Sequence, residues 1–284
     1  MDDYQACTDI QEDVWGHGFS ERVAPAILMI ANRLGGLSAG AFDDGGALQG
    51  FVFGLTGLID GDLVHWSDML AVRPEARDQG IGTRLKWYQR EVLLERGIRR
   101  MHWTFDPLQG RNAHVNFSKL GIVCTKYVEE MYGQTDSPLH DGVGTDRLVA
   151  TWEMDSDRVK GRLAGEDGCA SPEEFRNLPR VLQVQEGGSH PIPGAADLDA
   201  TDPSIHLAVP GDIDAMMEED LPLAIRWREA TRAPFLHYLS HGYEVREFVR
   251  AGAVSGYVLK RREVAEVDGS PVDRSAEGNG GPSQ

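Results

Sequence analysis

Long apolar runs and cysteine are both scarce in this sequence. No apolar run approaches the roughly 20 residues that a membrane-spanning helix needs, so we expect no membrane contact. The three cysteines, Cys7, Cys124 and Cys169, lie far apart and are odd in number. Such spacing does not form a disulfide framework or a set of metal ligands. We therefore expect no structural disulfide and no metal.

A secretory signal is also missing from the start of the sequence. Residues 1–4 read Met-Asp-Asp-Tyr, which is acidic where a signal peptide carries basic residues and then an apolar stretch. A cytoplasmic location is the expectation.

Positive charge is in short supply. Asp and Glu number 45 against 28 Lys and Arg, which gives a formal net charge of −17, and only five residues are lysine. A nucleic-acid surface needs clustered Lys and Arg, so this function is not expected. A small anionic cofactor remains compatible, because oriented backbone amides can hold it.

The composition is that of a folded protein, with 41% hydrophobic and 26% charged residues among 284. Hydrophobic periodicity predicts an alternation of helices and strands in the first half of the chain. Helices are expected at 5–15, 22–34, 81–96 and 109–120, and strands at 36–42, 48–55, 63–72, 100–105, 122–129 and 146–154. This order predicts an α+β (mixed α/β) fold with a mostly covered central sheet.

The second half is less regular. Residues 155–204 are rich in Gly, Pro and Asp, a composition typical of a linker with some ordered pieces, such as a strand at 180–185. A strand at 205–209, a helical stretch at 212–240 and strands at 243–250 and 255–261 follow. Pro222 and Pro234 are expected to divide the helical stretch.

These patterns predict four parts of the chain. They are a catalytic domain at 1–155, a linker at 156–203, a smaller C-terminal α+β subdomain at 204–264 and a disordered tail at 265–284.

The segment from Val72 to Leu85 carries the strongest functional signal. An apolar strand enters a turn with Gly80 and Gly82, and the turn opens directly into an amphipathic helix. Backbone amides and the positive end of the helix dipole then point to one spot, which suits a pyrophosphate. A third glycine of a Rossmann fingerprint is absent, since Leu85 stands there, and so is the Gly-Lys-Ser/Thr of a P-loop. Taken alone, the turn could equally be a plain strand-to-helix connection.

A second motif removes much of that ambiguity. The sequence Arg77-x-x-Gly80-x-Gly82 is followed some thirty residues later by an Asn-Ala helix, from Asn112, that ends in Lys-Leu-Gly at 119–121. Both motifs, in this order, resemble the GNAT family of N-acetyltransferases. The resemblance is strong for 63–130 and extends to a predicted-acetyltransferase subgroup with a C-terminal extension. It implies a central mixed sheet flanked by helices, with acetyl-CoA or another acyl-CoA as cosubstrate.

The resemblance also implies roles for individual residues. The pyrophosphate would be held by the backbone amides of the loop, with Arg77 nearby, and the pantetheine arm would pair with the main chain of a strand. Those cofactor-binding positions are Leu70, Val72, Arg77, Gln79, Gly80, Ile81, Gly82, Thr83 and Asn112. For Asn112 a helix cap is an equal alternative.

The catalytic groups are harder to assign, because two positions depart from the family pattern. Phe117 stands where the family often has a tyrosine that protonates the leaving thiolate, and Trp66 stands where it often has a glutamate base. Asp68, Asp106 and Tyr132 are the catalytic candidates from the remaining polar residues. Asp106 could instead be a turn former before Pro107.

The resemblance leaves one strand of the sheet unaccounted for. The family fold begins with a strand before its first helix, and this sequence begins almost at the helix. That edge strand is lost, or a strand from the C-terminal half fills its place.

Two arginines four residues apart, Arg228 and Arg232, share a face of the C-terminal helical stretch. They could clamp the carboxylate of a substrate, which would suit an amino acid acceptor or a succinyl donor. Pairing with Asp or Glu of this acidic chain is the alternative.

Three functions fit the sequence. The first is an acyl-CoA-dependent N-acyltransferase that acts on a small amine, such as an amino acid, by direct attack in a ternary complex. The second is a catalytically inactive CoA-binding sensor or scaffold. The third is an interaction protein whose C-terminal half forms a homodimer.

Overall fold

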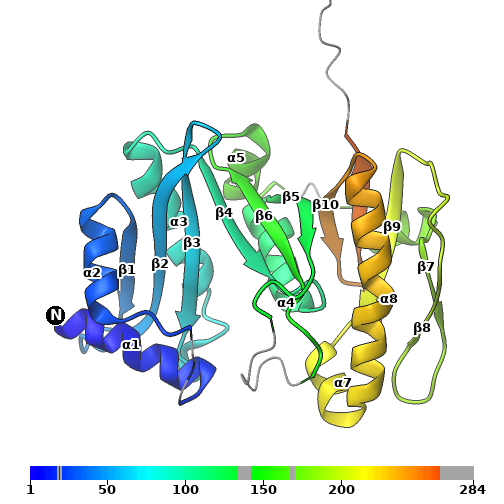
Figure 1. The fold of residues 1–284 in the computed structure, drawn as a ribbon, viewed down its shortest axis with the longest axis horizontal. Helices are drawn as coiled ribbons and strands as arrows, with labels where there is room; N and C mark the ends of the chain where they lie inside the picture. Colours follow the sequence, from blue (N-terminus) through cyan, green and yellow to red (C-terminus); the bar gives the residue numbers. More distant parts are fainter. Residues whose placement is uncertain (18, 20, 134–141, 167–169, 263–284) are drawn as a thin grey trace, which may run out of the picture.

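A nine-stranded mixed sheet forms the centre of the computed structural model, with helices on both of its faces (Figure 1). The structure describes residues 1–262 apart from 18, 20, 134–141 and 167–169. The strand order is β1-β2-β3-β4-β6-β5-β10-β11-β9, and β7 and β8 form a separate two-stranded sheet. The α+β class predicted from the sequence is confirmed.

The elements of the first half follow the predicted order. They are α1 (Asp2–Trp15), α2 (Pro25–Arg33), β1 (Leu37–Phe42), β2 (Leu48–Ile59), β3 (Asp62–Val72), the 3₁₀ turn η1 (Pro74–Ala76), α3 (Ile81–Glu95), β4 (Arg100–Phe105), α4 (Gly110–His114), the π-helical segment η2 (Val115–Leu120), β5 (Val123–Val128) and β6 (Arg147–Glu153).

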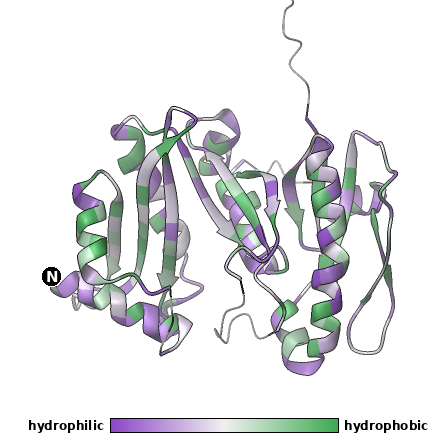
Figure 2. Ribbon diagram, viewed as in Figure 1, coloured by the Kyte–Doolittle hydropathy of each residue, from purple (hydrophilic) through white to green (hydrophobic). Residues whose placement is uncertain are grey.

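Side-chain alternation on β2 explains how the first helices are placed. Phe51 and Phe53 point to one face and pack with α1 and α2, whereas Val52 points to the other and packs with Ile81 and Leu85 of α3. Figure 1 shows α1 and α2 in front of the first strands and α3 behind them. Figure 2 shows that α2 is mainly hydrophobic, in keeping with its role in this packing.

The second half contains more regular structure than its composition suggests. Its elements are α5 (Asp157–Leu163), α6 (Pro172–Asn177), β7 (Leu182–Gln185), β8 (Ile192–Ala196), β9 (Ser204–Pro210), α7 (Ile213–Glu219), α8 (Leu221–Ser240), β10 (Tyr243–Val249) and β11 (Val254–Arg261). The range 156–203 thus holds two helices and a hairpin. The expected disordered tail, 265–284, lies outside the described residues.

The helical stretch, expected to divide into two or three pieces, divides into two. The chain does divide just before Pro222, at Asp220, but α8 continues through Pro234 to Ser240. A proline inside a helix removes one backbone hydrogen bond. Burial of the Pro234 ring and of its neighbour Phe235 in the core stabilises the helix in spite of that loss.

The expected replacement of the missing edge strand by the C-terminal half is wrong. β10, β11 and β9 extend the sheet beyond β5, at the end opposite to β1, and β1 is the edge of the described sheet. Cys124 of β5 pairs with Val245 of β10 at the junction. The C-terminal half therefore enlarges the sheet and leaves the first edge as it is.

Candidate active site

A gap between two neighbouring parallel strands lies in the middle of the sheet. β3 pairs with β4 only from Val64 to Trp66, opposite Arg100 to His102. Beyond this point β3 continues to Val72 and β4 to Phe105 without further pairing, and the strands diverge (Figure 1). The gap has its apex at Ser67 and Trp103, the first residues after the pairing ends, and its mouth at the carboxyl ends of the strands.

A β-bulge on β3 lies next to this apex. Phe53 of β2 pairs with Met69 and Gly54 pairs with Ser67, so Asp68 is the extra residue. A bulge interrupts the ladder and redirects the strand and its side chains. The Asp68 residue as a whole is exposed to solvent. Its carboxyl group is nevertheless partly desolvated by the surrounding protein, and this raises the pKa of Asp68.

Beyond the bulge, the main chain of β3 offers hydrogen-bonding groups to the gap. Arg73 donates its backbone N–H to Gln49 at 2.9 Å, so Arg73 is directed toward β2. Because alternate residues of a strand direct their N–H and C=O groups to opposite sides, Val72 and Leu70 face the gap. An extended arm could add there as a further strand.

The turn after β3 converges on the mouth of the gap. Gly80 has φ +74° and precedes the first residue of α3, and Asp78 has φ +64°. Among the described residues, no hydrogen bond is made by the backbone N–H groups from Gln79 to Thr83. A helix start with several free amides and the positive end of its dipole binds phosphate oxygens.

Close packing explains the second glycine of the turn. A Cβ atom on Gly82 would lie 3.3 Å from Cδ2 of Leu70, so the helix start fits tightly against β3. On Gly80, in contrast, a Cβ atom would meet nothing within 4 Å, so the start of the helix is open at this residue. A pyrophosphate at the amides and its attached arm along Leu70 and Val72 both fit this site.

Two arginines lie near the turn. Arg77 donates from Nε to the carbonyl of Val72 at 3.4 Å, and Arg111 of α4 forms an ion pair with Asp78.

Asn112 is exposed at the third position of α4, whereas Gln109 is the N-cap residue. The alternative role of Asn112 as a helix cap is therefore wrong, and its contact with the cofactor stays a prediction.

Comparison with known proteins assigns the first part of the chain to a family. Residues 4–121 match the family model described as the acetyltransferase (GNAT) family. Residues 4–121 are a GNAT acetyltransferase domain. In its general class this domain is therefore an acyl-CoA-dependent N-acetyltransferase domain. No curated protein matches the sequence.

Several solved structures are similar to part of the chain. The ribosomal-protein-S18-alanine N-acetyltransferase of Escherichia coli is 16% identical over 55% of this chain and 90% of its own, with a TM-score of 0.43. An aminoglycoside 6′-acetyltransferase type Ii is 16% identical over 54% and 90%, with a TM-score of 0.42. A chain of the NatC complex bound to Gag peptide and CoA is 13% identical over 53% and 89%, with a TM-score of 0.43. These values are too low to assign a substrate.

Polar side chains surround the gap of the GNAT domain on the sheet face opposite α3. Thr104 of β4 and Tyr132 share a hydrogen bond of 2.9 Å between their hydroxyl oxygens. The guanidinium carbon of Arg147, on β6, lies 5.3 Å from the centroid of the Tyr132 ring. The rings of Trp66 and His102 lie 6.4 Å apart on the same face. An acceptor that approached from this face would meet hydroxyl groups, aromatic rings and a cation.

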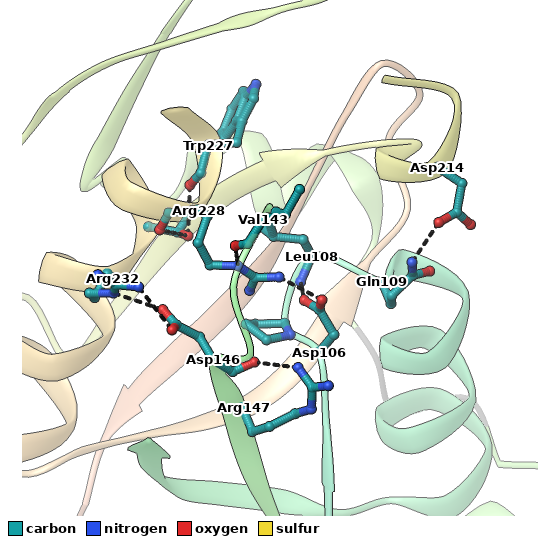
Figure 3. Close-up of polar contacts among 12 residues, drawn as sticks. Asp106, Leu108, Gln109, Val143, Asp146, Arg147, Asp214, Trp227, Arg228 and Arg232 are labelled. Carbon is teal, nitrogen blue, oxygen red and sulfur yellow. Dashed lines mark hydrogen bonds and ion pairs between the residues drawn. The ribbon is translucent and has the colours of Figure 1, made fainter. Parts of the chain in front are cut away.

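Asp106 and Arg228 form a buried ion pair (Figure 3). Nη2 of Arg228 donates to Oδ2 of Asp106 at 2.5 Å, and Nε donates to the carbonyl of Val143 at 3.1 Å. Oδ1 of Asp106 accepts from the backbone N–H of Leu108 at 2.7 Å. This bond forms a turn, the alternative to a catalytic role for Asp106. Both oxygens of Asp106 are thus engaged, and the geometry does not support a catalytic base at this position.

Arg232 also bonds to carboxylates of this chain. Nε and Nη2 donate to the two oxygens of Asp146 at 2.8 and 2.9 Å, and Nη2 reaches Glu130 at 3.2 Å. Burial acts to raise the pKa of Asp146, but the bonds from Arg232 and the Tyr127 hydroxyl hold it below its usual range. The expected substrate clamp is therefore not supported, because Arg228 joins α8 to Asp106 after β4 and Arg232 joins it to Asp146 before β6.

Sequence reasoning missed a buried polar group on α3. Lys86 is 6% exposed, and its Nζ donates to Oγ of Ser67 at 2.7 Å. Gln89 is fully buried beside them and accepts from Ser67 at 3.1 Å. A signal was present, since helical spacing places Gln89 on the face of Leu85 and Leu93, which are both buried.

The two departures from the family pattern are both visible in the structure. Phe117 is fully buried in η2, where its ring packs edge-on against Phe105 and Tyr257. Trp66 is half-buried beside the apex. Neither side chain can exchange a proton in the reaction.

Cys7 and Cys124 are buried free thiols, and burial raises the pKa of both, so neither is an activated nucleophile. Cys169 lies outside the described residues. No group of three or more His, Cys, Asp and Glu suited to a metal ion occurs in the described part of the chain. Over the same residues, no helix is long and apolar enough to cross a membrane.

Proposed function

We propose that the chain transfers an acetyl or succinyl group from CoA to a small amine, such as an amino acid, by direct attack in a ternary complex. One observation carries the proposal. The unpaired edge of β3 leads directly to the free amides at the start of α3, so a phosphate-bearing arm can be held along its whole length.

Different residues of the gap bind the cofactor and transfer the proton. The amides from Gln79 to Thr83 bind the pyrophosphate, and the main chain of Leu70 and Val72 orients the arm, which delivers an activated acyl group at the apex. Asp68 lies at the bulge beside the apex and accepts the proton that the amine loses, directly or through a water molecule.

The opposite face of the gap suits the acceptor. Thr104 and Tyr132 present hydroxyl groups there, and Arg147 adds positive charge that favours an amine bearing a carboxylate. Arg228 and Arg232 have no part in this proposal. A small acceptor, the homodimer and the cytoplasmic location all stay predictions.

A paired acceptor panel tests the proposal. Each amino acid is matched with the amine that lacks its carboxylate, and thiol release is followed with acetyl-CoA and with succinyl-CoA. We expect release only in the presence of an amine, and faster release with the carboxylate-bearing member of a pair. Equal rates within every pair would contradict the acceptor class, and no release with any amine would contradict the transferase.

Replacement of Asp68 by asparagine should lower kcat/KM by about a hundred-fold, the usual contribution of a general base. The base must be ionised, and its pKa is raised, so wild-type activity should fall as the pH drops through that raised value. In Asp68→Asn this decline should be absent.

The pH dependence of kcat/KM measures the role of Asp68. Asp44→Asn, at an exposed residue of the β1–β2 turn, is the matched control and should keep the wild-type profile. An unchanged acid limb in Asp68→Asn would exclude Asp68 as the base.

A CoA-binding sensor is the second candidate, and the burial of Phe117 favours it, because no hydroxyl is available there. Binding of CoA without turnover on any member of the panel would establish this function instead.

A further inference from the structure

The amino group of Lys86 lies at the apex of the gap between β3 and β4. Its Nζ is 2.7 Å from Oγ of Ser67, the first residue of β3 beyond the pairing, and 3.9 Å from the ring centroid of Trp103, the first such residue of β4. α3 thus places its one buried lysine where the two strands separate.

No carboxylate contacts this amino group among the described residues. Its other polar neighbours are Oε1 of Gln89 at 3.4 Å and Sδ of Met101 at 3.9 Å, which are both neutral. Burial lowers the pKa of Lys86 to about 7, so the group can give up a proton near neutral pH. A purely structural lysine would be expected to have an acidic partner at this depth.

The titratable and charged groups around Lys86 come from two elements. On β3, His65 is buried, and burial together with the charge of Lys86 lowers its pKa to about 3, so it is neutral in the working range. On α3 itself, Arg90 donates to the carbonyl of Met154 at 2.6 Å. Lys86 is therefore the group at the apex, on the α3 side, that changes its charge near neutral pH.

We propose that Ser67 gives its hydroxyl proton to the sulfur of the departing CoA thiolate, and that Lys86 holds this hydroxyl in place and returns the proton to it. The inference rests on the proposed function and names the proton donor of that reaction.

Strand length places the sulfur near Ser67. The six residues from Ser67 to Val72 span about 17 Å at the usual rise of a strand. An extended pantetheine arm has a comparable length, so an arm anchored at the start of α3 and running along β3 ends near the apex. Ser67 offers a hydroxyl group there on the α3 side, whereas Phe117 carries none.

The amine nitrogen attacks the thioester carbon, a C–N bond forms, and the C–S bond breaks with its electron pair left on sulfur. The Ser67 hydroxyl turns away from Oε1 of Gln89, to which it donates in the structure, and gives its proton to sulfur. Ser67 then takes a proton from the Lys86 ammonium. Asp68 has accepted the proton lost by the amine, and exchange with solvent restores Asp68 and Lys86.

The first test needs no turnover. The thiolate of bound CoA is followed by its ultraviolet absorbance against pH, in wild type and in Lys86→Met. A neighbouring amino group that takes up a proton stabilises the thiolate. The thiolate should therefore form in wild type at a pH roughly one unit or more below the pH at which it forms in the variant. Lys160→Met, at an exposed lysine of α5, is the control and should match wild type.

The second test is the pH profile of kcat. Wild-type kcat should fall as the pH rises through the pKa of Lys86, since the ammonium is the form that supplies the proton. Ser67→Ala should lower kcat by about a hundred-fold. Lys86→Met should lower it by a similar factor and remove the alkaline decline. Lys86→Arg, whose charge does not titrate, should fail to rescue kcat.

The outcomes separate this inference from the proposed function. Turnover in wild type, with unchanged thiolate titration and pH profile in Lys86→Met, would overturn only the role of Lys86. A shifted titration without turnover in wild type would support the contact with sulfur and contradict the transferase. Calorimetry of CoA binding checks that each variant is folded, and wild type that binds no CoA would overturn both.

Discussion

Replacement of Gly80 by glutamate should weaken acetyl-CoA binding by at least about a hundred-fold, because the site relies on charge-assisted bonds to phosphate. The new side chain would project into the space in front of the amides from Gln79 to Thr83. Its carboxylate would compete for those donors and repel the pyrophosphate. The protein itself has room for the substitution, so the variant should fold, at a cost of about 1–2 kcal/mol for a non-glycine residue in the left-handed region.

Gly46→Glu is the matched control for this experiment. Gly46 has φ +83° and, as at Gly80, a Cβ atom placed there would meet nothing within 4 Å, but it lies in the turn between β1 and β2. Calorimetric titration should show wild-type affinity in Gly46→Glu and an affinity at least about a hundred-fold lower in Gly80→Glu. Equal affinity in the two variants would show that CoA binds elsewhere.

Replacement of Arg228 by methionine should lower the free energy of unfolding by about 3–5 kcal/mol, the usual result of removing one partner of a buried ion pair. The Arg228 side chain is 2% exposed and Asp106 is 18% exposed, so Asp106 would keep a largely buried charge without its partner. Val143 would lose a hydrogen-bond donor as well. The change should act on stability, because Arg228 joins α8 to the end of β4.

Urea unfolding measures this effect. Arg99→Met removes an ion pair with Asp155 in which both side chains are well exposed, and should cost less than about 1 kcal/mol. The double variant Arg228→Met with Asp106→Asn should recover part of the loss, since it no longer leaves a buried charge unpaired. A loss in Arg228→Met as small as that in Arg99→Met would contradict the buried pair.

Local patterns predicted the glycine turn before α3. The positions of Gly80 and Gly82 between an apolar strand and an amphipathic helix specify a turn with free amides, since glycine permits the positive φ and the close approach. The roles expected for the main chain of Leu70 and Val72 came from the family resemblance. These features depend on residues close together in the sequence.

Features that depend on distant residues were not predictable in the same way. Arg228 and Asp106 are 122 residues apart, and helical spacing alone could not distinguish an ion pair from a substrate clamp. The bulge at Asp68 and the end of pairing at Trp66 follow from the register of three strands. The position of the C-terminal strands beside β5 depends on packing across the two halves, which periodicity does not encode.

The apex of the gap shows a similar limit. Lys86 lies on the buried face of α3 together with the polar residues Gln89 and Arg90, but only the fold brings Ser67 and Trp103 to its amino group. A lysine with no acidic partner at that depth has no distinctive local pattern. Its importance became visible from burial and contacts together.

Acyl transfer from the gap between β3 and β4 is tested most directly by measuring thiol and acylated amine together. Wild type and Gly46→Glu should form one acylated amine for each CoA thiol released, and Gly80→Glu should form neither. Product formation in Gly80→Glu at the wild-type rate, or binding of acetyl-CoA by wild type without product from any amine, would contradict the account.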